Sequence, residues 1–238
     1  MKLDATDMQY DVLNDTLRQC TDRDYEITGL LGQRFIAAGA ADRHIALHGT
    51  PGNALAAYLN GATVEVYGNA QDAVGDTMNA GEVVVHGNIG DAAGYAMRGG
   101  SIYVRGNAGY RAGIHMKAYR DKVPHLVIGG VAGSFLGEYQ AGGVIVVLGL
   151  DSDRPIVGNF PCTGMHGGQV LLRSTAEEVV LPPNVHSCRI EAAGSEFEPV
   201  IRAWCRHFGR DAEEVLEGPY TLITPDTNNP YKQMYVQN

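Results

Sequence analysis

The sequence predicts an all-β fold, a right-handed parallel β-helix of about seven coils with helical caps at its N- and C-terminal ends. Three observations favour it. Glycine supplies 31 of the 238 residues, glycines recur every 19 residues, and a short apolar strand precedes each recurring glycine. Strands of three or four residues are too short to form hairpins within one repeat. Each can instead pair with the equivalent strand one repeat further on, at about 4.8 Å.

The repeat is carried by one glycine position, and two insertions interrupt its period. Five extra residues fall in the 117–124 stretch and six around 151–160, and both are expected to be loops. Glycine at this position suits a corner where two backbones approach closely. The marker glycines of the repeat are Gly68, Gly87, Gly106, Gly130 and Gly149.

Two further sets of residues recur with the same period. Met78, Met97 and Met116 lie 19 residues apart and are expected to stack as a file of interior side chains. Asparagine follows the marker glycine in three repeats, at positions 69, 88 and 107. We expect these amides to bridge adjacent corners by side-chain hydrogen bonds.

The two ends of the chain depart from the repeat, so the sequence divides into three segments: an N-terminal helical cap (1–24), a parallel β-helix of 19-residue repeats (25–192), and C-terminal helices with an extended tail (193–238). A helix is expected over 7–20, and strands over 178–181 and 187–190 are expected to close the stack.

The C-terminal segment predicts two helices and a tail. Apolar residues at Phe197, Val200, Ile201, Trp204 and Phe208 indicate an amphipathic helix that stops at Gly209. A short helix is expected to start at Asp211 and end before Gly218. The polar, proline-bearing stretch 219–238 is expected to be extended and suited to wrapping a neighbouring chain.

Charge and motifs exclude several functions. With 18 basic against 27 acidic residues, the formal charge is −9, which disfavours binding to nucleic acid. The N-terminus lacks the pattern of a signal peptide, so a cytoplasmic location is expected. The four cysteines form no C-x-x-C, no H-E-x-x-H occurs, and no phosphate-binding loop is present. We therefore predict no catalytic, cofactor-binding or metal-binding residue in this chain.

The best local evidence for function lies in three segments that occupy equivalent points of successive repeats. They are 113–120, 135–139 and 163–168, and they flank the two expected loops. A contact surface is favoured there over a catalytic site, because spacing assigns no nucleophile, base and orienting group. The candidate partner interface consists of Lys117, Tyr119, Glu138, Tyr139 and His166.

These residues carry a family resemblance. The repeated G-x-x-G-x-x-x-G units, with Ile114-His115-Met116-Lys117, Phe135-Leu136-Gly137-Glu138-Tyr139 and Thr163-Gly164-Met165-His166-Gly167-Gly168, resemble the GXGXG domain over roughly residues 10–235. That domain is the C-terminal β-helix of the glutamate synthase large subunit. A similar domain is a separate chain in many prokaryotes, including a subunit of N-methylglutamate synthase.

The resemblance implies a non-catalytic scaffold in a hetero-oligomer. It would brace a glutamine amidotransferase-type subunit and a synthase subunit that carries FMN and an iron–sulfur cluster. This chain has neither the N-terminal cysteine nucleophile nor the flavin-binding barrel of the large subunit, so no cofactor is expected in it.

Two alternatives remain open. One scaffold subunit of formylmethanofuran dehydrogenase, a molybdenum or tungsten complex, carries the same coils and is a more distant resemblance. An autonomous β-helix enzyme acting on carbohydrate is disfavoured by the absence of an export signal.

Overall fold

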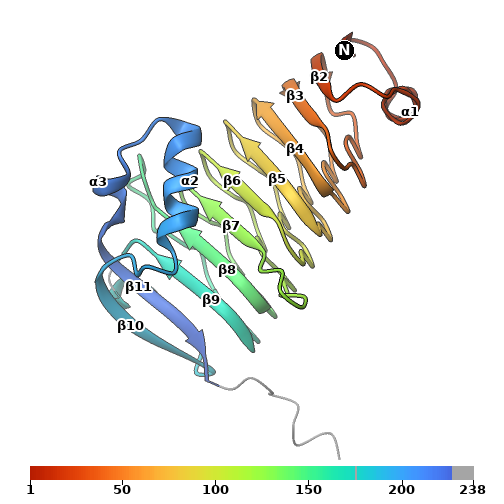
Figure 1. The fold of residues 1–238 in the computed structure, drawn as a ribbon. Coiled ribbons are helices and arrows are strands. Elements are labelled where there is room, and N and C mark those ends of the chain that lie inside the picture. Colours follow the sequence, from red (N-terminus) through yellow and green to blue (C-terminus); the bar gives the residue numbers. More distant parts are fainter. Residues whose placement is uncertain (175, 227–238) are drawn as a thin grey trace, which may run out of the picture.

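The strands of this protein form a single sheet. The computed structural model describes residues 1–174 and 176–226, and Figure 1 shows their strands stacked from one end of the molecule to the other. The order is β1-β2-β3-β4-β5-β6-β7-β8-β9-β11-β10. The first nine strands are parallel, whereas β11 is antiparallel to both of its neighbours. The strands are β1 (Lys2–Asp4), β2 (Asp24–Leu31), β3 (His44–Thr50), β4 (Asn60–Tyr67), β5 (Ala80–Val85), β6 (Ser101–Val104), β7 (His125–Ile128), β8 (Ala141–Val147), β9 (Gly167–Leu172), β10 (Val185–Ala192) and β11 (Glu217–Pro225).

This architecture corrects the predicted all-β, right-handed parallel β-helix of about seven coils with helical caps. Only one side of each repeat forms a regular strand, so the strands build one mostly parallel sheet with few helices. The rest of each repeat consists of turns, joined across repeats by isolated bridges such as Ala70–Ile89 and Ile89–Ala108. The reason is local, because alternate residues of the turns adopt left-handed backbone, which cannot continue a strand.

Pairing within the sheet follows the repeat. Val64 lies opposite Val83, which lies opposite Ile102, so paired residues are 19 positions apart. The next partner of Ile102 is Leu126, because the first insertion falls between them. The predicted pairing of each strand with the equivalent strand one repeat on is thus confirmed by the register.

Two kinds of side chain fill the interior: inward-facing residues of the strands, and residues at equivalent positions of the turns. Met78, Met97 and Met116 are fully buried, as is Gln140, the residue at the equivalent turn position of the next repeat. Burial of a side chain of this size stabilises the fold by about 1.5–3 kcal/mol. Together with the inward-facing valines, leucines and isoleucines these residues form one continuous core along the stack.

The corner residues have two structural roles. A Cβ atom added at Gly68 would collide with the backbone of Gly49 one repeat earlier, and Gly87, Gly106 and Gly130 are equally crowded. Gly149 differs, because its φ of 63° lies in the left-handed region. The predicted amide bridges are confirmed, because each asparagine oxygen accepts the N–H one repeat on: Asn69 from Asn88 at 2.8 Å, Asn88 from Asn107 at 2.8 Å, and Asn107 from Val131 at 2.9 Å.

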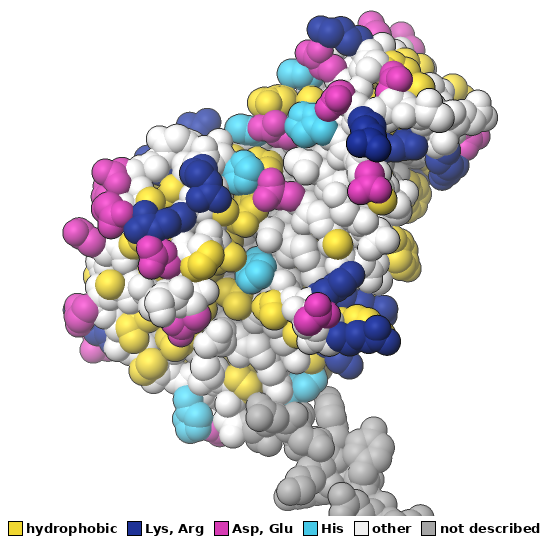
Figure 2. Space-filling view, in the orientation of Figure 1, with side chains coloured by type: hydrophobic (Ala, Val, Ile, Leu, Met, Phe, Trp, Pro, Cys, Tyr) yellow, Lys and Arg dark blue, Asp and Glu magenta, His cyan; other side chains and the backbone are white. Residues whose placement is uncertain are grey.

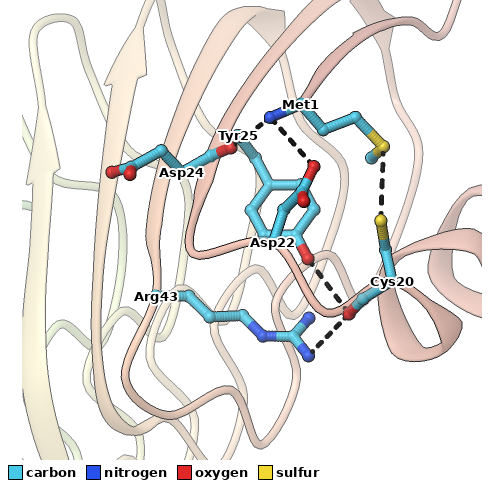
Figure 3. Close-up of polar contacts among 6 residues, drawn as sticks. All are labelled: Met1, Cys20, Asp22, Asp24, Tyr25 and Arg43. Atoms are coloured by element: carbon cyan, nitrogen blue, oxygen red, sulfur yellow. Dashed lines mark hydrogen bonds and ion pairs between the residues drawn. The ribbon is translucent and has the colours of Figure 1, made fainter.

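Helix α1 (Tyr10–Gln19) lies beside the first strands and is tied down at its C-terminal end. Arg43 donates to the carbonyls of Leu17 and Cys20 at 2.6 and 3.1 Å, and the Tyr25 hydroxyl also donates to Cys20. The N-terminal ammonium of Met1 bonds the Asp24 carbonyl at 2.5 Å in the same cluster (Figure 3). The Arg43 and Tyr25 donors satisfy carbonyls at the end of α1, where helix ends leave such groups open.

Helix α2 (Glu198–Phe208), followed by the short α3 (Ala212–Leu216), does not cap the end of the stack as predicted. It lies on the outward face of the sheet (Figure 1), where Phe197, Ile201 and Trp204 join a second apolar cluster with Tyr103 and Val127. The physical reason is that the strands of this half of the sheet are apolar on both faces and need cover on both.

The C-terminal end of the stack is closed by strands. The expected strand over 187–190 lies within β10, whereas the one expected over 178–181 is replaced by a 3₁₀ helix, Ala176–Glu178, and irregular chain. The first part of the expected tail is β11, and positions 227–238 lie outside the described residues. Within the described ranges, no helix is both long and apolar enough to cross a bilayer.

Candidate partner interface

Each turn between strands places three residues in left-handed backbone, at positions i, i+2 and i+4. In one repeat Arg111, Gly113 and His115 have φ of 58°, 72° and 56°. In the next, Phe135, Gly137 and Tyr139 have φ of 61°, 64° and 53°. Left-handed backbone costs about 1–2 kcal/mol for a residue with a side chain. Bulky residues here are therefore held against their local preference by the stack.

Several of these turn residues carry rings that form two columns. Phe135 lies between Tyr110 and Phe160, with ring centroids 5.2 and 5.3 Å apart. His115 lies between Tyr95 and Tyr139, at 5.9 and 5.2 Å, and stacks on Tyr139 with an interplanar angle of 12°. We call these six residues the aromatic turn surface.

The aromatic turn surface is open to solvent. Phe160 is 63% exposed and Tyr139 38% exposed, and both have φ above 50°. A row of exposed rings is characteristic of an interaction surface, whereas scattered exposed apolar residues are ordinary. Sequence reasoning named Tyr139 as an interface residue and included His115 and Phe135 in its candidate segments, but missed Tyr95, Tyr110 and Phe160. The sequence signal that could have identified these residues is a side-chain ring that recurs at equivalent turn positions of successive repeats.

Glu138 has a role different from the one predicted. It is only 6% exposed, and its Oε2 accepts from Nε of Arg111 at 2.7 Å. The Arg111 guanidinium in turn lies over the rings of Tyr110 and Phe135, at 4.9 and 5.4 Å. Glu138 therefore braces the turn from inside, and its carboxylate is not presented to a partner.

Replacing Glu138 by glutamine is expected to lower the free energy of unfolding by about 1–3 kcal/mol, because the Arg111 guanidinium then loses the buried carboxylate with which it pairs. Urea denaturation would measure the loss. The exposed Glu214→Gln serves as the control and should stay within about 0.5 kcal/mol of the parent. Equal stabilities for the two variants would contradict the bracing role.

The first insertion forms a hairpin rich in positive charge. Tyr119 and Lys122 exchange two backbone hydrogen bonds of 3.0 and 3.1 Å, and Arg120 lies over the Tyr119 ring at 5.2 Å. Lys117, Arg120 and Lys122 are exposed, and none of them forms an ion pair within the described part of the chain. Figure 2 shows dark blue side chains gathered at the loop between β6 and β7. We call residues 117–122 the basic hairpin.

The predicted interface residues are only partly brought together. The Tyr139 ring packs against Gly164, where an added Cβ would come within 2.5 Å of the ring. His166 Nδ1 lies 3.0 Å from the carbonyl oxygen of the same Gly164. Tyr139 and His166 therefore both contact Gly164 from neighbouring repeats, whereas Lys117 and Tyr119 belong to the basic hairpin.

A third set of polar side chains lies on the outward face of the sheet, beside the part that α2 covers, where Phe208 of α2 contacts His86. The rings of His48, Tyr67 and His86 stack with centroids 4.9 and 4.8 Å apart. Glu65 lies 2.8 Å from His86, and although burial opposes the shift, hydrogen bonds with His86 and Tyr67 hold the pKa of its carboxyl below the ordinary value.

Groups capable of redox or metal chemistry are sparse. No set of three histidine, cysteine or acidic residues in 1–174 and 176–226 is arranged to hold a metal ion. Burial raises the pKa of the Cys162 thiol to about 12, so this thiol is not a ready nucleophile at neutral pH.

A family model described as the GXGXG motif matches residues 4–222. The chain belongs to the GXGXG motif family. The three left-handed positions of each turn have the spacing of G-x-G-x-G, so the family name corresponds to a backbone requirement seen here. This chain keeps glycine at the centre in Gly75, Gly94, Gly113 and Gly137, and places rings or arginine at outer positions of several turns.

Two individual proteins extend the comparison. An uncharacterized protein of Methanocaldococcus jannaschii is 40% identical over 248 residues, which cover 98% of this chain and 95% of that protein. A chain from the crystal structure of the formyltransferase/hydrolase complex of Methylorubrum extorquens, solved with methylofuran, is similar with a TM-score of 0.63. It is 19% identical, with 92% of this chain and 88% of that chain covered. At this identity, the likeness establishes a shared fold.

Proposed function

We propose that this chain is a non-catalytic scaffold subunit of a multi-subunit enzyme complex. The observation that carries the proposal is the aromatic turn surface, whose rings lie at or beside left-handed turn positions and are largely open to solvent. Membership of the GXGXG motif family supports the same reading, and the structural neighbour comes from a complex of several chains. The reacting groups and cofactors would then belong to the partner chains.

The sheet is physically suited to hold partners at a fixed separation. Hydrogen-bonded ladders join every strand from β1 to β10, and one core runs beneath them. Such a stack resists bending because each strand is fixed by both neighbours. Partners docked at different repeats would therefore keep a constant distance from one another.

The structural neighbour favours a complex of formyl-group chemistry, in which this chain would take the place of the scaffold subunit that formylmethanofuran dehydrogenase contains. The second candidate rests on the family match. A glutamate-synthase-like or N-methylglutamate-synthase-like complex would pair the chain with an amidotransferase-type subunit and a synthase subunit carrying FMN and an iron–sulfur cluster.

The chemistry of the two surfaces suggests what the partner presents. The aromatic turn surface calls for apolar pockets that accept rings, and the basic hairpin calls for carboxylates. The hairpin concentrates positive charge on a chain whose formal charge is −9. At short range this local positive charge would therefore orient an acidic partner toward this one edge.

The complex can be identified by purifying the tagged full-length chain from its native host and sequencing the chains that co-purify in fixed ratio. Formyltransferase or hydrolase chains, or a molybdopterin-binding chain, would support the first candidate. An amidotransferase-type chain with a flavin synthase chain would support the second. Recovery of the chain without any partner in fixed ratio would contradict the scaffold proposal.

Replacing Phe160 by glycine is expected to weaken assembly while leaving the fold stable. Glycine adopts the φ of 58° at this position without strain, so the change removes an exposed ring and little else. A ring at the centre of an interface is typically worth about 2 kcal/mol or more, which corresponds to a loss of about 30-fold in affinity. Co-elution of the purified partners would measure it. The matched control is Leu31→Ala, at a position that is also exposed but lies on β2, near the opposite end of the sheet.

A further inference from the structure

Strand β10 leaves one edge of the sheet open. It is the last strand in the sheet order, with β11 as its one neighbour among the described residues, and Figure 1 shows it as the outermost strand. Six of its eight residues are exposed. Long exposed edge strands are usually shortened, covered or protected by charge, because their unpaired backbone groups accept another strand. At the opposite end, β1 has three residues.

The hydrogen-bond register identifies which backbone groups of β10 face outward. The Asp226 N–H donates to the Asn184 carbonyl at 3.1 Å, in the same register as β10 and β11. Bonded and non-bonded pairs alternate along an antiparallel ladder. His186, Cys188 and Ile190 therefore bond to β11, whereas the N–H and C=O groups of Val185, Ser187 and Arg189 point away from it. The edge ends at a bulge between Ile190 and Ala192.

We propose that β10 pairs antiparallel with β10 of a second copy of this chain, about a two-fold axis at Ser187. This register satisfies all three outward residues at once, because Ser187 faces Ser187 and Val185 faces Arg189 of the other copy. Six N–H···O=C bonds would form. The two arginines stay apart, since each lies opposite a valine, and no like charges face each other. Because a two-fold pairing uses the same edge on both copies, it ends at a dimer, whereas a head-to-tail pairing could add copies without limit.

The register makes a specific covalent prediction. Residues that face each other in a hydrogen-bonded antiparallel pair have Cα atoms about 5.5 Å apart, within the range that a disulfide spans. Starting from full-length Cys188→Ser, which removes the exposed native thiol, Ser187→Cys should form a covalent dimer under mild oxidation with oxidised glutathione. His186→Cys in the same background is the matched control. Position 186 faces 188 of the other copy, so its own two thiols do not meet.

We expect the 187 variant to give a dimer yield at least about fivefold above the 186 variant on a non-reducing gel, with mass spectrometry locating the bond between the two 187 thiols. Thermal melting would show that both variants fold. Equal yields at 186 and 187 would indicate random collision and would overturn the proposal, as would no dimer from either. Cross-linking that appears only after deletion of residues 227–238 would mean that this segment occupies the edge, which also overturns it. The inference is independent of the proposed function.

Discussion

Replacing Trp204 by alanine is expected to lower the free energy of unfolding by about 3–5 kcal/mol. This indole is 1% exposed and anchors α2 to the outward face of the sheet. Its Nε1 donates to the carbonyl of Val104 at 2.8 Å, a contact between residues 100 positions apart. The backbone of Gly129 lies directly against the indole, so that an added Cβ at Gly129 would collide with the ring.

Two companion variants separate the contributions. Trp204→Phe keeps most of the apolar contact but loses the hydrogen bond, and should cost about 0.5–1.5 kcal/mol beyond the change in volume. The Val104 carbonyl keeps the bond that it accepts from the Gly129 N–H at 2.8 Å. Gly129→Ala leaves the indole intact but places a Cβ against both the ring and the Arg105 carbonyl, so it should strain the sheet as well as displace α2. Chemical denaturation of the three proteins would give the order. A loss below about 0.5 kcal/mol for Trp204→Ala, as at a surface site, would show that α2 does not stabilise the sheet.

Replacing Met97 by alanine is expected to cost about 2–5 kcal/mol, and replacing it by leucine less than about 1.5 kcal/mol. Met97 is fully buried in the file that also contains Met78 and Met116. Alanine leaves a cavity in the middle of the stack, whereas leucine restores most of the volume. Urea denaturation of both variants would measure the difference.

Gly94 offers an independent check in the same repeat. Its φ of 69° is a conformation in which a β-branched side chain is strained. Gly94→Val should therefore lower the free energy of unfolding more than Asn88→Ala, which removes one amide bridge. If Met97→Ala and Gly94→Val both stay within about 0.5 kcal/mol of the parent, the assigned register of this repeat is wrong.

The sequence predicts the register of the sheet well, because a strict period leaves one consistent pairing. The 19-residue step from Val64 to Val83 is the observed step, and Asn88 bridges the repeats as expected. The period does not reveal how much of each repeat is extended. Ala92 and Ala96 adopt φ of 54° and 48°, conformations that alanine rarely takes, so no local preference distinguishes the turns from strands.

The placement of α2 is a long-range property that its own sequence does not contain. Its amphipathic pattern predicts a helix with a buried face, but not the surface that covers it. A signal existed in the strands: Leu126, Val127 and Ile128 are apolar in succession and all buried, which is typical of a strand covered on both faces. The polar outward residues Glu65 and Tyr67 mark the half that α2 leaves open.

The candidate interface shows the same limit. Equivalent spacing correctly places Tyr139 at an exposed turn, but it cannot tell an inward from an outward side chain, so Glu138 was assigned to the surface although it pairs internally with Arg111. In a turn of alternating left-handed residues, neighbours point in different directions. Phe160 and Tyr139 occupy exposed left-handed positions of successive turns, and this pattern can be recognised only once the backbone conformation is known.

The central claim is that this chain supplies architecture and its partners supply the chemistry. It is tested most directly by purifying the assembled complex, separating this chain from it, and recording the absorption spectrum and turnover of each fraction. We predict that flavin, iron–sulfur or molybdopterin absorption and all activity stay with the partner fraction, and that neither survives in the separated chain. A stoichiometric cofactor band or sustained turnover in the fraction that contains this chain alone would contradict the account.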